Sequence, residues 1–280
     1  MKTLSVNTNL TGMCRVIPDI PYIVRDGREY YMQIIQPWAA DFGKKFPTVL
    51  FVQGCAWTTP DVYGEIPQLS RLAERGYVVA TVTHRDCMEG HPYPAYLQDV
   101  KSAVRFLRKH AAEYGIDTEH IGLWGTSSGA NASMLVAMTQ GEPSLTTEDN
   151  AEQSEQVNFV VDCFGPIDMK MTMEYSPDAE FDDILEHAVA PDSNYTREEK
   201  ITKMSPLQVA EAGNDYPPML LLHGDKDMLI SYEQSKKLHE RLKELGYQPE
   251  FVTVEGADHE SNFWSKEVLE LIFEFIGQHI

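Results

Sequence analysis

The chain of 280 residues carries 43 acidic and 23 basic side chains, which gives a formal net charge of −20. Its hydrophobic fraction of 42% and charged fraction of 24% match those of ordinary globular proteins and exclude an intrinsically disordered chain. The negative charge would repel polyphosphates and anionic membranes, so we expect no nucleic-acid and no membrane partner. It also disfavours a strongly anionic substrate, unless the binding site carries local cations.

The four cysteines are too irregularly spaced for a zinc site or a disulfide framework, and none forms a C-x-x-C pair. The N-terminus lacks the apolar stretch of about 7–15 residues that a signal peptide requires. No segment reaches the roughly 18 apolar residues of a membrane span. These patterns predict reduced thiols and a cytoplasmic protein without a metal or a cofactor, while association into a homo-oligomer remains open.

Two stretches near the N-terminus, 15–24 and 28–36, are predicted to form an antiparallel hairpin that turns at Asp26-Gly27 and lies at one edge of a sheet. Short apolar runs of the kind found in strands buried on both faces follow it. They begin at Thr48, Tyr77, His120, Asn158, Met219 and Phe251.

Helical patterns separate these runs. One covers residues 95–114, with apolar side chains near helical spacing. Another starts at Ser231, where S-Y-E-Q matches a capping box, and closes at Gly246. The last begins near Asn262 and continues to the C-terminus. The alternation predicts an α/β fold with a mostly parallel central sheet flanked by helices.

Two segments interrupt the alternation. Residues 141–156 are polar and acidic, and we expect a solvated loop there. Residues 169–216 contain short helical pieces between two strands. We interpret them as a small cap inserted into a single domain that spans residues 1–280, with a surface decoration of no functional role as the alternative.

The most informative segment is G-T-S-S-G at residues 125–129, which lies between a predicted strand and an Ala-rich helix. Glycines on either side of Ser127 permit a tight turn that exposes the serine hydroxyl at the helix N-terminus, where the helix dipole favours a developing negative charge. A plain glycine turn is the alternative. The placement between strand and helix favours Ser127 as a nucleophile.

A serine hydroxyl needs a base and an acid to activate it, and both follow later in the chain. His259 lies just after the last predicted strand and is the candidate base. Asp225 and Asp227 share one loop, and motif position favours Asp227 as the acid, with Asp225 holding the loop together. Asp258 is discounted because it cannot easily reach the ring of the neighbouring residue.

Three other histidines lie near the predicted site. His223 closes a strand and is interpreted as a structural hydrogen-bonding group. His84 and His91 flank a loop that could approach the site. The remaining histidines lie on or beside predicted helices or strand edges, where solvent exposure is expected.

An oxyanion that forms on a carbonyl carbon also needs hydrogen-bond donors. One should be the backbone N–H of Ser128. The others should come from the loop after the first long strand, F-V-Q-G-C-A-W, in which Gly54 gives the backbone freedom and makes Cys55 and Ala56 the natural donors. A reactive Cys55 thiol is the alternative, but no basic residue lies nearby in sequence.

These residues resemble the α/β-hydrolase esterases close to the hormone-sensitive-lipase-like and the acetyl-xylan or feruloyl esterase groups. The resemblance runs from about Thr48 to the C-terminus. Its main motifs are Q-G-C-A-W, G-I-D-T-E-H-I-G-L-W-G-T-S-S-G-A, F-G-P-I-D, H-G-D-K-D and G-A-D-H. It implies an α/β-hydrolase fold, a triad of Ser127, Asp227 and His259, and hydrolysis of carboxylic esters.

The resemblance is less specific for the substrate. The family's oxyanion motif begins H-G-G, whereas Gln53 and Cys55 replace its first and third members. Similarity to the polysaccharide branch implies short-acyl esters of xylo-oligosaccharides, feruloyl-type esters or another small ester. Trp57, Tyr63 and Trp264 are candidate stacking surfaces for a sugar or an aromatic acyl group, with ordinary core packing as the alternative.

Three other functions are considered. An aryl formamidase looks similar around the oxyanion loop. A prolyl-type peptidase is disfavoured because no large extra domain is visible in the sequence. A binding protein on a hydrolase scaffold would normally have lost a triad member, and all three candidates are present.

Overall fold

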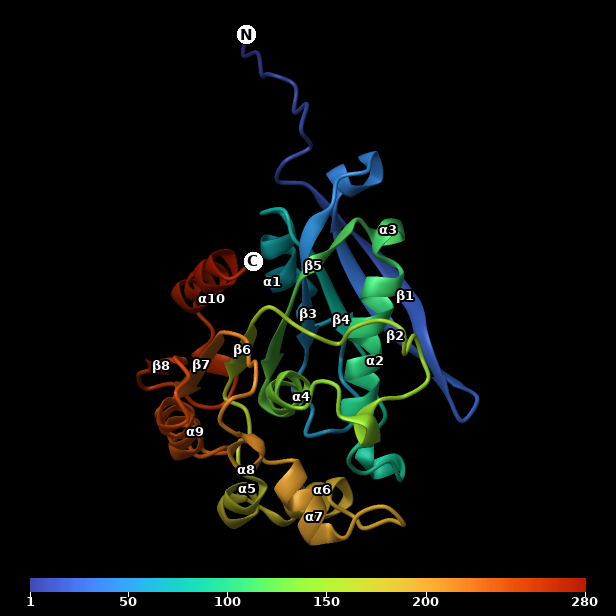
Figure 1. Cartoon of the computed structure of the whole chain (residues 1–280). Coiled ribbons are helices and arrows are strands. Elements are labelled where there is room, and N and C mark those ends of the chain that lie inside the picture. Colours follow the sequence, from blue (N-terminus) through green and yellow to red (C-terminus); the bar gives the residue numbers. More distant parts are fainter.

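An eight-stranded sheet forms the centre of the molecule in a computed structural model that describes residues 1–280. Its strand order is β1-β2-β4-β3-β5-β6-β7-β8 (Figure 1). The strands are β1 (Cys14–Arg25), β2 (Arg28–Pro37), β3 (Phe46–Val52), β4 (Val78–Val82), β5 (Ile116–Thr126), β6 (Val160–Cys163), β7 (Met219–Gly224) and β8 (Glu250–Val254). All pairs are parallel except β1 with β2 and β2 with β4. The predicted α/β class is confirmed.

The N-terminal hairpin also matches its prediction. β1 lies at the edge of the sheet and pairs antiparallel with β2. The turn residues Asp26 and Gly27 have φ values of 51° and 79°. Positive φ at both central positions is what a two-residue turn compatible with strand twist requires, and Asp-Gly supplies it at low cost.

Helices cover both faces of the sheet, so its central strands are buried on both sides, whereas the edge strands β1 and β8 are partly exposed. They are α1 (Ile66–Ala73), α2 (Ala95–Lys109), α3 (Ala111–Tyr114), α4 (Ser127–Met138), α5 (Met169–Tyr175), α6 (Ala179–Ala188), α7 (Arg197–Lys203), α8 (Pro206–Val209), α9 (Glu233–Glu244) and α10 (Lys266–Gln278). Along β3, Leu50 packs in the core that α2, α4 and α9 share, whereas Val49 and Phe51 pack with α1 and α10. This alternation follows from the two-residue period of a strand.

Two predicted helix starts were wrong. The capping box at Ser231 does not form, because the Gln234 side chain instead accepts the backbone N–H groups of Ile167 and Asp168, each at 2.9 Å. The C-terminal helix begins at Lys266 rather than near Asn262, and the Ser265 side chain caps it.

The prediction of a solvated loop at 141–156 was also wrong in part. Glu155 in this loop is only 7% exposed. Its carboxylate pairs with the buried Lys101 at 2.7 Å and with Arg105 at 2.9 Å. Part of the acidic character of this segment therefore neutralises buried cations of α2. The composition of the segment alone does not reveal this pairing with a distant helix.

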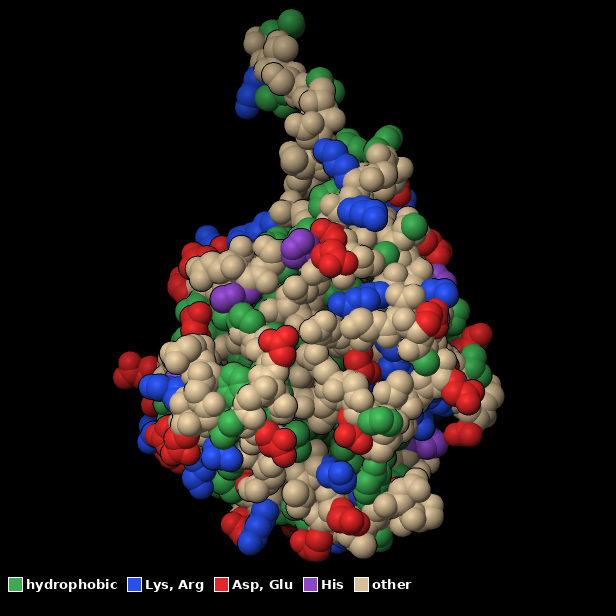
Figure 2. All heavy atoms as spheres, in the orientation of Figure 1, with side chains coloured by type: hydrophobic (Ala, Val, Ile, Leu, Met, Phe, Trp, Pro, Cys, Tyr) green, Lys and Arg blue, Asp and Glu red, His purple; other side chains and the backbone are tan.

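The segment expected to be a cap, 169–216, contains α5 to α8. Figure 1 shows these helices gathered at one end of the sheet, with the N-terminal segment projecting at the opposite end. Figure 2 shows Asp and Glu side chains spread over the visible face among Lys and Arg side chains. None of the helices combines the length and the apolar character needed to cross a membrane.

Candidate active site

Ser127 lies where β5 ends and α4 begins, in a turn with a φ of 48° at the serine itself. Positive φ is unusual for a serine and is typical of a strained strand-to-helix turn that presents a nucleophile. The flanking glycines are required for close packing. A Cβ atom on Gly125 would lie 2.3 Å from the carbonyl oxygen of Gly129, and one on Gly129 would lie 2.0 Å from that of Val52.

The three predicted triad residues meet at this turn. The Oγ atom of Ser127 lies 3.0 Å from Nε2 of His259. The Nδ1 atom of the same ring lies 2.7 Å from Oδ2 of Asp227. One imidazole thus touches both the hydroxyl and the carboxylate, and this geometry allows proton transfer from serine to a histidine held in one orientation.

Asp227 is buried, and its carboxylate is fully engaged. Its Oδ1 atom accepts the backbone N–H groups of Leu229 and Ile230, at 2.9 and 2.8 Å. Its Oδ2 atom contacts Nε2 of His223 at 3.0 Å as well as His259. Burial acts to raise the pKa of Asp227, but the hydrogen bonds from the two histidines outweigh it and hold the pKa well below its usual range.

His223 was interpreted from the sequence as a structural hydrogen-bonding group, and the structure shows this role, with the acid of the triad as its partner. It is fully buried, and its Nδ1 atom lies 2.7 Å from Oγ of Ser235. Its Nε2 atom faces the carbonyl oxygen of Ile230, so it carries the hydrogen that Asp227 accepts. The signal in the sequence was its position, four residues before the acid at the end of a buried strand.

The alternative acids have other roles. Asp225 accepts the backbone N–H of Gly256 at 2.6 Å and so links its loop to the turn after β8. Asp258 accepts the backbone N–H groups of Met228 and His259, at 2.9 and 2.7 Å. Neither carboxylate hydrogen-bonds the His259 ring.

The oxyanion loop packs directly on the nucleophile turn. The backbone N–H of Cys55, a predicted oxyanion donor, instead donates to Oγ of Ser128 at 2.9 Å. This corrects the role expected for Cys55, because its amide is already occupied. The N–H of Ala56 makes no hydrogen bond within the protein, and that of Ser128 lies in the first turn of α4, where helices leave such groups free. These two amides are the candidate donors.

The thiol of Cys55 is held by contacts within the loop and with a neighbouring histidine. It lies 3.1 Å from the carbonyl oxygen of Thr58 and 3.6 Å from Nε2 of His84. Burial raises the pKa of Cys55 to about 12, and burial lowers the pKa of His84. A neutral imidazole beside a protonated thiol argues against a reactive cysteine. We interpret His84 as a residue that packs against the oxyanion loop through this contact.

A small cavity of about 220 Å³ lies over the triad. Ser127, His259 and the oxyanion loop line it, together with Phe181 of α6 and Leu229. Phe181 shows that the 169–216 segment contributes to this wall. Glu260, which follows the histidine at a φ of 58°, adds a carboxylate to the rim.

Of the three predicted stacking residues, Trp57 lines this cavity, whereas Tyr63 and Trp264 do not. Trp57 is 1% exposed, and its Nε1 atom lies 3.4 Å from Oδ1 of Asn131. Tyr63 is 53% exposed but bonds Asp19 outside the cavity. Trp264 packs against Trp124 and donates to Glu260 at 2.9 Å. For both tryptophans the contacts are those of the alternative, ordinary core packing.

No group of three or more His, Cys, Asp or Glu side chains is arranged to hold a metal ion.

Comparison with known proteins places this arrangement in a family. The family model described as BD-FAE matches residues 32–242, about three quarters of the chain. The chain belongs to the BD-FAE family. The matched part of this BD-FAE chain contains Ser127, Asp227 and the oxyanion loop, whereas His259 lies beyond it.

Individual relatives of this BD-FAE protein are esterases. Esterase LipC of Mycobacterium tuberculosis is 30% identical over 224 residues, which cover 77% of the chain and 53% of LipC. A carbohydrate esterase from gut microbiota, solved in truncated form, superposes with a TM-score of 0.75 at 24% identity, covering 95% of this chain and 96% of that one. Esterase 2 of Thermogutta terrifontis, solved with butyrate bound, gives a TM-score of 0.77 at 23% identity, with 96% and 95% covered.

These structures confirm the α/β-hydrolase fold. The chain spans about half to three fifths of the length of the curated esterases that it matches first.

Proposed function

We propose that this protein is a serine carboxylic ester hydrolase. The observation that carries the proposal is the continuous chain of contacts from Ser127 Oγ through the His259 ring to Asp227, at 3.0 and 2.7 Å. Membership of the BD-FAE family and the esterase relatives support it. A second series of contacts runs from Ser235 through His223 to the same Asp227, but Ser235 and His223 are fully buried, so no substrate can reach that serine.

The reaction follows from this geometry as two acyl transfers. His259 takes the Ser127 proton as the hydroxyl attacks the ester carbonyl, then returns it to the leaving alcohol. It next activates a water molecule that releases the acid. Asp227 holds the ring and stabilises its charged form, while the N–H groups of Ala56 and Ser128 stabilise the oxyanion.

The proposed substrates are short-acyl esters of carbohydrates, such as acetylated xylo-oligosaccharides, with feruloyl-type esters as the second candidate. The cavity of about 220 Å³ is smaller than the roughly 300–1,000 Å³ of typical ligand pockets, which favours a small acyl group. One structural neighbour is described as a carbohydrate esterase. In this proposal α5 to α8 form a cap, through which Phe181 limits the acyl length.

The test compares hydrolysis of p-nitrophenyl acetate, butyrate and octanoate with release of acetate from acetylated xylo-oligosaccharides. We expect turnover to be highest with acetate and to extend to the oligosaccharides. The Ser127→Ala variant should lose at least about 10⁴-fold in kcat, because the serine, base and acid act as a unit. Its melting temperature should stay close to that of the unsubstituted protein.

Residual turnover near the native level in Ser127→Ala would overturn the serine mechanism. Turnover of p-nitrophenyl acetate without release of acetate from oligosaccharides would agree with the proposed esterase activity but contradict the proposed carbohydrate substrate. A folded protein that is inactive on every ester would contradict the esterase proposal and favour the alternative of an amidase that acts on N-formyl arylamines.

A further inference from the structure

A second and larger cavity lies on the other side of the oxyanion loop. It encloses about 880 Å³, within the range of small-molecule sites. The lining residues that matter here are Arg85, His91, Gln98, His187, Asn194 and Tyr195. We call it the Arg85 pocket. The triad does not use it, and its lining combines these polar side chains with apolar surface.

The Arg85 pocket is close to the triad cavity. Cys87 lines it, and the Cys87 thiol lies 3.9 Å from the carbonyl oxygen of Ala56, which lines the triad cavity. Helix α6 borders both, with Phe181 in the triad cavity and His187 in the Arg85 pocket. Six helical residues correspond to about 9 Å, which is the spacing along α6 between the two linings.

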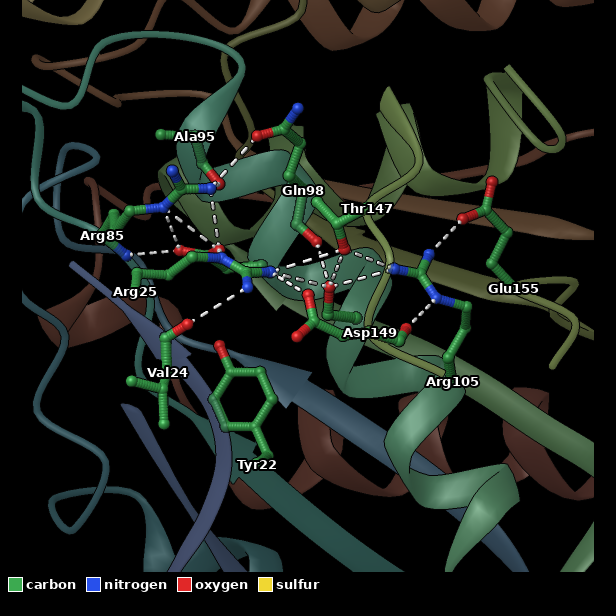
Figure 3. Close-up of polar contacts among 12 residues, drawn as sticks. Tyr22, Val24, Arg25, Arg85, Ala95, Gln98, Arg105, Thr147, Asp149 and Glu155 are labelled. Atoms are coloured by element: carbon green, nitrogen blue, oxygen red, sulfur yellow. Dashed lines mark hydrogen bonds and ion pairs between the residues drawn. The ribbon is translucent and has the colours of Figure 1, made fainter. Parts of the chain in front are cut away.

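Arg85 offers a free donor edge to this pocket. Its side chain is 14% exposed, and Asp99 holds it through Nε at 3.0 Å and Nη2 at 2.9 Å. The Nη2 atom also donates to the carbonyl oxygen of Ala95 and to Gln98 (Figure 3). The Nη1 atom has no partner within the protein and is not sealed from solvent. The guanidinium is thus fixed in place with unused N–H groups.

A network of salt bridges lies behind this wall and holds Arg85 in place. The half-buried network that Figure 3 shows ties α2 to β1 and to the 141–156 loop through salt bridges. Its cations are Arg25, Arg85, Lys101 and Arg105, and its carboxylates are Asp99, Asp149 and Glu155. Glu142 adds a fourth carboxylate, because it accepts a hydrogen bond from the pocket residue Ser144 at 2.8 Å and also acts on Lys101. The charges of this region therefore balance, and Arg85 is the one Lys or Arg side chain in the pocket lining.

Other groups on the wall suit the rest of such a ligand. The side chains of His91 and Asn194 form no hydrogen bond within the protein and are free to bind hydroxyl groups. The carboxylate on the wall, Asp192, is already paired with the buried Lys200 at 2.6 Å. It therefore offers little repulsion to an incoming anion. Tyr195 adds an aromatic ring.

We propose that the Arg85 pocket binds the carboxylate of a uronic acid residue in the oligosaccharide whose ester is cleaved at Ser127. This rests on the proposed function. The planar guanidinium edge matches the planar carboxylate, and polar side chains with an aromatic ring match the sugar hydroxyls and ring face. The pocket would thus select acidic over neutral oligosaccharides and place the ester at the triad.

The test measures binding without turnover. The full chain carrying Ser127→Ala is titrated calorimetrically with xylotriose that bears one glucuronic acid and with unsubstituted xylotriose. We expect the acidic sugar to bind at least about tenfold more tightly, since one charge-assisted pair contributes about 1.5–3 kcal/mol. Adding Arg85→Gln should abolish the difference. Arg15→Gln, which removes the same charge at an exposed site outside the pocket, should preserve it.

If Arg85→Gln lowers the melting temperature strongly, His91→Ala and Asn194→Ala serve instead, because neither side chain supports the fold through a hydrogen bond. Each should weaken binding of both sugars several-fold, because both carry the hydroxyl groups, while the preference for the acidic sugar remains. Equal affinity for both sugars, or binding of inorganic phosphate but not of the acidic sugar, would overturn the proposal. The assay needs no ester hydrolysis, so an inactive protein that still prefers the acidic sugar would contradict only the proposed function.

Discussion

His223 and Asp227 form a buried contact of 3.0 Å between Nε2 and Oδ2, on the same oxygen that His259 approaches at 2.7 Å. The imidazole of His223 therefore holds the Asp227 carboxylate, and this carboxylate orients the imidazole of His259. Because Nε2 of His223 also faces the carbonyl oxygen of Ile230, its hydrogen can point only toward acceptors. His223 is thus a positioning residue for the acid of the triad.

Replacing His223 by Leu should lower kcat about 10- to 100-fold with little change in KM, since a hydrogen bond to a charged group contributes about 1.5–3 kcal/mol. His223→Gln, whose amide can reach the same carboxylate oxygen, should recover part of the loss. The measurement is steady-state hydrolysis of p-nitrophenyl acetate. Ser235→Ala is the matched control, because it removes only the contact at Nδ1. Equal losses in Leu and Gln variants would show that His223 acts through packing alone.

The Ser128 hydroxyl holds the oxyanion loop through the Cys55 amide at 2.9 Å. Ser128→Ala should free this amide and loosen the placement of Ala56, with a loss in kcat of about tenfold and an unchanged KM. Ser128→Thr keeps the hydroxyl and should restore the rate. If Ala and Thr variants matched the native kcat, the loop would be held without this bond.

Gly54 is where the oxyanion loop touches the nucleophile turn. A Cβ atom there would lie 2.5 Å from Cβ of Ser127 and 2.7 Å from the carbonyl oxygen of Thr126. Gly54→Ala should push the two segments apart and lower kcat at least about 100-fold, because small misplacements of reacting groups are costly. Gly277→Ala in α10 is the control, since the nearest atom to its Cβ lies 3.5 Å away. Native-like kcat in Gly54→Ala would contradict the close approach.

Asp162 in β6 should give the fold a pH dependence. Burial raises the pKa of this carboxyl to about 6, and its Oδ2 atom has no hydrogen-bond partner. An unfolded chain ionises it near pH 3.9, so the free energy of unfolding should fall as the pH rises from about 4 to 6, by about 3 kcal/mol in total. Asp162→Asn cannot ionise and should be more stable than the native protein above pH 6.

Urea unfolding of both proteins at pH 4, 5, 6 and 7.5 measures this difference. The gap between the two curves should widen up to about pH 6 and then stay constant. A gap that is the same at every pH would mean that Asp162 does not titrate in this range.

The local sequence was sufficient for the strands, the hairpin and the nucleophile turn. Strand periodicity, Asp26-Gly27 and the glycines around Ser127 are short-range signals, because each reflects the backbone geometry of a few consecutive residues. The order of Ser127, Asp227 and His259 along the chain then predicted which side chains meet, since the C-terminal ends of parallel strands share one edge of the sheet. Asp227 and Asp225 could be ranked by motif position alone.

Only the tertiary structure decided the contacts between distant segments. The Cys55 amide donates to Ser128. The Gln234 side chain accepts the backbone N–H of Ile167 and does not cap a helix. Glu155 is buried against the cations of α2. In each case a polar group had several possible partners in sequence. Burial forces each such group to find a partner nearby in space, and which partner lies nearby depends on how the helices and loops pack, a relationship that the local sequence does not encode.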